Sequence, residues 1–205
     1  MTDPTIRIKD AWLLREAASV PLNELWGDGE PLKTDDDYAA ITKAYQQAWQ
    51  PFETKILGGM TDILGLSFKQ NIIDVYIAPW FNAFSDPLVI GVTLEPDVFV
   101  DILTHELIHR LFTDNTSIPD EALLLTKWRQ LFGEQNSFGM TVHIPVHAVH
   151  KAIYLDVLKA PERLERDLAN NQKNNATDYI NAWNYVDEHG YQEIITKLQQ
   201  SYSER

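Results

Sequence analysis

Apolar residues recur at every third or fourth position along most of the chain, a spacing that predicts helices. The first predicted helix runs from an N-cap at Thr34 through an acidic first turn to Trp49, and Pro51 ends it. Proline suits a first helical turn, and it marks the start of several later segments. Further helices are expected over 52–64, 96–112, 119–131 and 145–158, then from Pro161, from Thr177 to a stop at Gly190, and finally to Leu198.

Two short segments carry a different pattern. Ile72–Ile77 and Leu88–Leu94 are rich in β-branched residues and are each followed by proline, which predicts two strands of one small sheet. Residues 1–33 contain scattered proline and glycine and are expected to be irregular. The fold class predicted is therefore α+β, mostly helical, with a small sheet packed beside the helix over 96–112.

The length of 205 residues is enough for one large domain or two small ones. We expect a single domain over 1–205. Its parts are an irregular and helical segment over 1–70, the sheet and the following helix over 71–115, and a helical segment over 116–205.

Charge and cysteine content narrow the function classes. The formal net charge of −13 repels phosphate backbones, so a nucleic-acid partner is not expected. The absence of cysteine excludes disulfides and thiolate metal sites, which leaves histidine and carboxylates as ligands for a transition metal. No apolar run approaches the length of a membrane span, and the N-terminus lacks an apolar signal core. We expect a cytoplasmic protein without a membrane partner.

Polar residues interrupt a helix that is otherwise apolar on all sides. His105, Glu106 and His109 lie in the middle of the segment 98–112, and such a helix is expected to be buried. Buried polar groups are costly unless they have partners. His105 and His109 are one turn apart and therefore point the same way, so a zinc ion (Zn²⁺) can bind both. Glu106 is offset around the helix and can act as general base for a metal-bound water.

The segment His105-Glu106-Leu107-Ile108-His109 resembles the HExxH motif of the zincin metallopeptidases. The resemblance implies a zincin-like domain in which the strand 88–94 is an edge strand that pairs with an extended peptide. The extended metzincin pattern would require glycine at Phe112 and histidine at Asn115, so that subfamily does not match. The gluzincin plan takes a downstream glutamate as third ligand, and Glu121 and Glu134 are the nearer candidates.

A third zinc ligand is also expected from the segment 143–150, which contains three histidines. His147 is the preferred ligand because it lies within the predicted helix 145–158, where the backbone fixes its direction. His143 and His150 are the next candidates, followed by Glu121. Tyr154 lies in the same polar stripe and is a candidate to stabilise the oxyanion of a tetrahedral intermediate.

The function predicted is a zinc-dependent peptidase that acts on a peptide or protein substrate through zinc-bound water, with Glu106 as base. Two alternatives stay open, namely a zinc amidohydrolase acting on a small amide and a non-catalytic zinc-binding helical domain. The pattern carries no prediction of oligomeric state.

Overall fold

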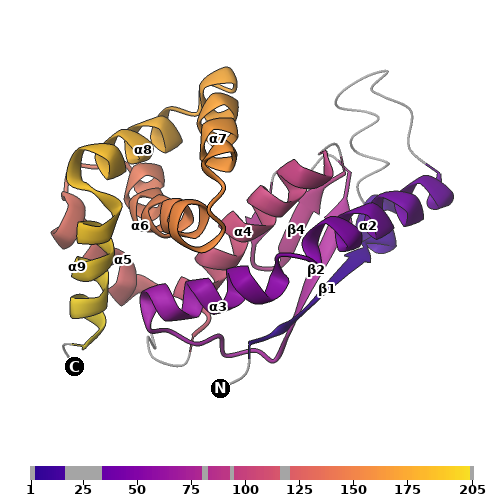
Figure 1. Cartoon of the computed structure of the whole chain (residues 1–205), viewed down its shortest axis with the longest axis horizontal. Coiled ribbons are helices and arrows are strands. Elements are labelled where there is room, and N and C mark those ends of the chain that lie inside the picture. Colours follow the sequence, from indigo (N-terminus) through magenta and orange to yellow (C-terminus); the bar gives the residue numbers. More distant parts are fainter. Residues whose placement is uncertain (1–2, 17–33, 80–82, 93–94, 116–120, 204–205) are drawn as a thin grey trace. The chain divides into compact units, whose positions relative to one another are not determined.

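The computed structural model describes residues 3–16, 34–79, 83–92, 95–115 and 121–203 (Figure 1). The chain divides into two compact units. The first comprises Met1–Asp3, Thr54–Asn71 and Leu107–Arg205, and the second comprises Pro4–Glu53 and Ile72–Glu106. The boundary falls within helix α4 (Pro96–Thr113), so this helix contributes residues to both units. The single domain expected from the sequence stays a prediction.

The second unit contains a four-stranded mixed sheet in the order β1-β2-β4-β3. Strands β1 (Thr5–Asp10), β2 (Ile72–Ala78) and β4 (Leu88–Gly91) run parallel, and β3 (Phe84–Ser85) is antiparallel to β4. All four residues of β4 are buried, as expected for a central strand of a largely parallel sheet. The predicted placement of two neighbouring strands in one sheet is confirmed for β2 and β4, while residues 93–94 of the second predicted strand lie outside the described residues.

Two expectations about the sheet were wrong. Residues 5–10 are a strand, not an irregular segment, and they pair with β2 in the register Ile8↔Val75. The alternation of Ile6 and Ile8 with polar residues is the local signal for this strand. Strand β4 is not an edge strand, because β2 and β3 flank it on its two sides.

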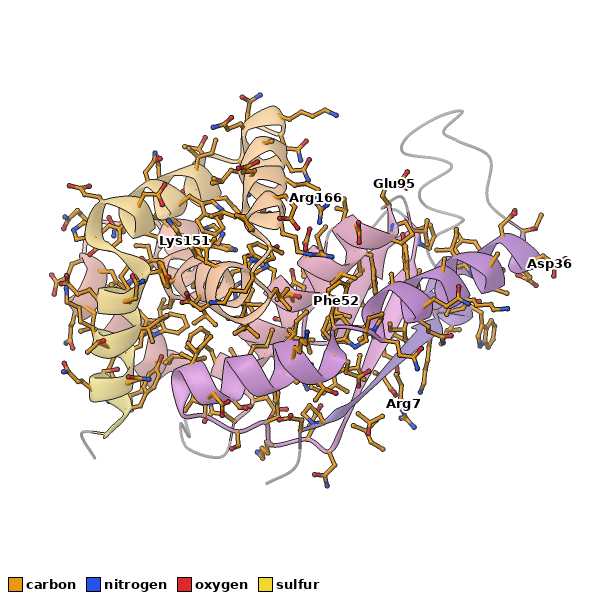
Figure 2. All side chains as sticks on the ribbon, in the orientation of Figure 1. Arg7, Asp36, Phe52, Glu95, Lys151 and Arg166 are labelled. Atoms are coloured by element: carbon orange, nitrogen blue, oxygen red, sulfur yellow. The ribbon has the colours of Figure 1, made fainter. Side chains whose placement is uncertain are left out.

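Helix α2 (Asp35–Trp49) begins where its sequence signals place it. Thr34 and Asp37 form a capping box, in which the Thr34 hydroxyl accepts a hydrogen bond from the Asp37 backbone. The acidic first turn, which includes Asp36 (Figure 2), is exposed. Farther along, Tyr45 stacks on Phe99 of α4, with ring centroids 4.1 Å apart. This contact fixes α2 against the first half of α4 within the second unit.

The first unit is helical. Its elements are α3 (Glu53–Leu64), α5 (Glu121–Phe132), α6 (Phe138–Ala152), the π-helical turn η1 (Ile153–Val157), α7 (Pro161–Lys173), α8 (Thr177–His189) and α9 (Tyr191–Ser203). Helix α6 packs against α5, α8 and α9, and most of its side chains are buried. Gly190 adopts a φ of 78° after α8, a left-handed backbone conformation in which glycine carries no steric penalty.

The start of α6 differs from the prediction, which placed it at Pro145. The helix begins at Phe138, because the Ser137 hydroxyl accepts a hydrogen bond from the backbone N–H of Met140 and so caps the first turn. Pro145 lies inside the helix. His143 is therefore a helical residue one turn before His147, with a direction equally fixed by the backbone.

The fold class is α+β, with a mostly helical chain and one small mixed sheet, as the sequence predicts. Within the part of the chain that the structure describes, no helix combines the length and the hydrophobicity that a bilayer crossing requires.

Candidate metal centre

Helix α4 brings His105 and His109 to one side, because residues four apart are neighbours on a helix surface. Side chains on almost every side of α4 are buried, and Phe99 and Leu107 are two of them. His105 and Glu106 are 8% and 7% exposed, while His109 retains more solvent contact. The predicted burial of this helix is confirmed.

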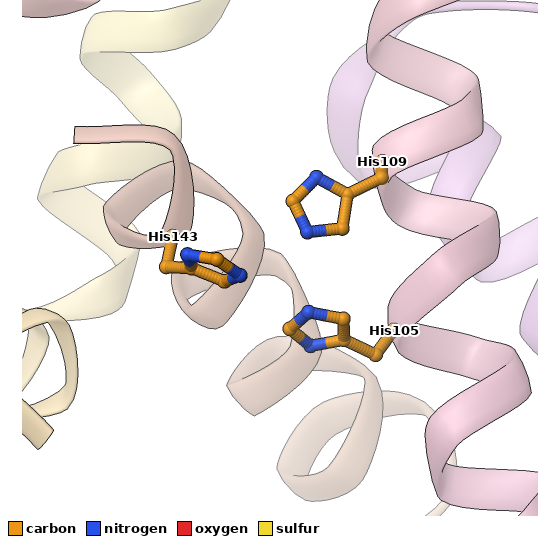
Figure 3. A group of neighbouring side chains, drawn as sticks. All are labelled: His105, His109 and His143. Carbon is orange, nitrogen blue, oxygen red and sulfur yellow. The ribbon is translucent and has the colours of Figure 1, made fainter. Parts of the chain in front are cut away.

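A third histidine reaches the same place from α6. The rings of His109 and His143 meet edge to face, with centroids 5.1 Å apart and an interplanar angle of 86°. His105, His109 and His143 each offer one ring nitrogen, and these nitrogens all lie within 4.8 Å of one another (Figure 3). We call these three residues the histidine cluster.

The donor set of the histidine cluster fits a transition metal ion. Imidazole nitrogen suits zinc, copper, iron and nickel. Two nitrogens bound tetrahedrally to zinc at about 2.0–2.1 Å from the metal lie about 3.4 Å apart. Small rotations of the imidazoles would therefore bring nitrogens now as much as 4.8 Å apart to bonding distance. Three protein ligands leave a fourth position open, as in catalytic zinc sites.

Burial sets the protonation states in the histidine cluster. It lowers the pKa of His109 to about 3, with a smaller contribution from His143, and it also lowers the pKa of His143. Both imidazoles are therefore neutral at pH 7 and have a lone pair for a cation. Burial raises the pKa of the Glu106 carboxyl to about 8. A cation bound nearby would lower the pKa of this carboxyl again, because it favours the ionised carboxylate.

One hydrogen bond defines the tautomer of His143. Its Nδ1 lies 2.6 Å from the backbone carbonyl oxygen of Gly139. A carbonyl only accepts, so Nδ1 carries the proton and Nε2 has the lone pair. In Figure 3 one ring nitrogen of His143 points toward the imidazole of His109 and the other points away from it.

His147, the ligand preferred from the sequence, does not belong to the histidine cluster. It is fully buried and stacks on Trp183 of α8, with ring centroids 4.2 Å apart and planes 11° apart. The preference for His147 follows from a helix starting at Pro145, and the earlier start at Phe138 removes that reason. The geometry favours His143 as third ligand.

The other candidates lie elsewhere or outside the described side chains. His150 is buried beside Tyr154, with ring centroids 4.2 Å apart. Tyr154 lies in η1, and π-helical turns are frequent at functional sites. Its role toward an oxyanion stays a prediction. Glu134 is exposed and not part of the cluster. The side chain of Glu121 lies outside the part of the chain that the structure describes.

Two residues of α8 beside the cluster are not predicted from the sequence. The Tyr179 ring packs on His143 with centroids 3.9 Å apart. Asp178 accepts a hydrogen bond of 2.7 Å from the Ser137 hydroxyl. The place of Ser137 before an apolar helical run is a local signal for its capping role, whereas the contacts from α8 depend on how the helices pack.

Comparison with known proteins found no relative of this chain. No family model, curated protein or solved structure matches the chain. The case for a function therefore rests on the histidine cluster and on Glu106.

Proposed function

We propose that this protein is a zinc-dependent hydrolase of the peptidase type, with the metal bound by His105, His109 and His143. The observation that carries the proposal is the convergence of three ring nitrogens within 4.8 Å, with a buried glutamate next to one of them in the sequence. A bound cation would compensate the free-energy cost of burying these histidines and the glutamate on an apolar helix. The likeness of residues 105–109 to the HExxH motif supports the same assignment.

Zinc, when bound, acts as a Lewis acid and lowers the pKa of a coordinated water to about 7. The three histidines would hold the metal through their ring nitrogens. Glu106 accepts a proton from the attacking water and delivers it to the leaving amine as the C–N bond of the substrate breaks. Burial of Glu106 strengthens its interaction with charges that develop in the reaction, because the local dielectric is low.

The experiment compares the zinc-loaded parent with Glu106→Gln and a matched control on a library of quenched fluorescent peptides. The amide of Glu106→Gln cannot accept a proton, so we expect zinc to stay bound and turnover to fall by about 10²–10⁴. The control is Asp97→Asn, which makes the same type of change in the exposed first turn of α4 and is expected to keep full activity.

The outcomes separate the candidate functions. A zinc-loaded parent that cleaves no peptide but hydrolyses small amides supports the amidohydrolase. A parent that binds zinc and hydrolyses neither class supports a non-catalytic zinc-binding domain. Loss of zinc from Glu106→Gln would mean that Glu106 is a ligand and not the base.

A further inference from the structure

The first turn of α6 is tied to the start of α8 close to His143. The Ser137 hydroxyl donates a hydrogen bond of 2.7 Å to Oδ1 of Asp178. Asp178 also lies against Gly139, since a Cβ at position 139 would stand 2.8 Å from Cγ of Asp178 and closer still to its Oδ2. Glycine at position 139 therefore leaves room for this carboxylate, and a larger residue would displace it.

The same turn determines how His143 is held. The Gly139 carbonyl accepts the hydrogen bond from Nδ1 of His143, and the Asp178 carboxylate lies against the same glycine. Tyr179, the residue after Asp178, packs on the His143 ring and limits its rotation. Two neighbouring residues of α8 therefore act on the tautomer and the orientation of one imidazole. Outer partners of this kind orient metal-binding histidines and raise their basicity.

We propose that Asp178 is a positioning residue for the metal centre. Its carboxylate holds the first turn of α6 so that the Gly139 carbonyl keeps the proton of His143 on Nδ1, which leaves the lone pair of Nε2 available to a metal ion. Its negative charge also favours a cation bound at His143. The second effect rests on the proposed function, whereas the effect on the tautomer exists in the metal-free protein as well.

A purely structural role for Asp178 is the competing explanation, because an acid in the first turn stabilises a helix and this one links α8 to α6. Asp187 offers a matched control. It lies on the same helix and forms an ion pair with Lys151 of α6, which is labelled in Figure 2. Asp187→Asn therefore removes a carboxylate that joins the same two helices at a different place, away from the first turn of α6.

The first arm measures zinc affinity by competition with a chromophoric chelator. Outer partners of metal ligands typically contribute about 10- to 100-fold, and Asp178 is half-buried and acts through Gly139, so Asp178→Asn is expected to weaken zinc binding by about tenfold. Asp187→Asn is expected to bind zinc like the parent. Parent-like affinity of Asp178→Asn, or an equal loss in both variants, would overturn the proposal.

The second arm measures the His143 tautomer in metal-free protein from the ¹⁵N chemical shifts of its ring. The parent and Asp187→Asn are expected to have the proton on Nδ1, while Gly139→Ala, whose Cβ displaces the Asp178 carboxylate, is expected to show a mixture of tautomers. An unchanged tautomer in Gly139→Ala would contradict the positioning role. If the parent binds no zinc, the proposed function fails and this second arm alone decides the role of Asp178.

Discussion

Truncation of His143 tests which histidine completes the metal centre. His143→Ala removes one of three ring nitrogens from the histidine cluster, whereas His147→Ala removes an imidazole that stacks on Trp183. Structural zinc sites with four ligands contribute about 10–16 kcal/mol, which is about 2.5–4 kcal/mol per ligand. Since about 1.4 kcal/mol corresponds to a factor of ten, His143→Ala is expected to weaken zinc binding by about 10²–10³.

The same substitutions should affect stability in the opposite order. His147 is fully buried, so His147→Ala leaves a cavity beside Trp183 and is expected to cost about 3 kcal/mol, as for other large aromatic truncations. His147→Phe retains a ring for the stack and serves as the volume control. His143 is 8% exposed, and its truncation is expected to cost less.

The assay is competitive zinc titration against a chromophoric chelator, at a temperature where circular dichroism shows each variant to be folded. We expect that His143→Ala loses affinity while His147→Phe binds zinc like the parent. The reverse ranking would contradict the assignment and would restore His147 as third ligand. Parent-like affinity in both variants would direct attention to Glu121, the gluzincin alternative.

Three further predictions concern stability. Burial lowers the pKa of His150 to about 3, whereas an unfolded histidine titrates near about pH 6.5, so stability is lost as pH falls below about 6.5. Between about pH 6.5 and 5, the neutral His150 is expected to account for a loss of about 2 kcal/mol in the free energy of unfolding. Urea titrations of the metal-free protein measure this loss, and His150→Gln should not show it. An equal pH dependence in the parent and in His150→Gln would argue against this role of His150. A Cβ on Gly59 would stand 2.9 Å from Cγ2 of Val157, whereas the nearest atom to one on Gly58 is 3.9 Å away. Gly58→Ala should therefore stabilise the protein by up to about 1 kcal/mol through helix propensity, whereas Gly59→Ala should destabilise it by about 1 kcal/mol net. Equal melting temperatures of the two variants would show that the side chains around Gly59 move aside without cost. Thr34→Ala should destabilise the protein by about 1 kcal/mol through loss of the α2 cap, which thermal unfolding measures, and Thr34→Ser should retain the stability of the parent.

Local signals in the sequence are enough to predict most of the helices. Thr34 with its following acids, Pro96 and Pro161 at helix starts and Gly190 after α8 each act through a few neighbouring residues, so these helix ends do not depend on the rest of the fold. Where two local signals compete, the prediction fails. Pro145 suggests a start for α6, but the Ser137 cap begins that helix earlier and the buried helix tolerates the proline inside it.

The amino-acid sequence is sufficient to show that His105 and His109 share one side of a buried helix, because residues four apart are neighbours whatever packs against them. The packing of the helices, by contrast, brings His143 to these two residues and Asp178 to Gly139. These pairs are more than thirty residues apart in the chain, and they meet because helices pack through side chains along their whole length. No periodicity within one segment predicts these contacts, so the proposed third ligand and its proposed positioning residue come from the tertiary structure.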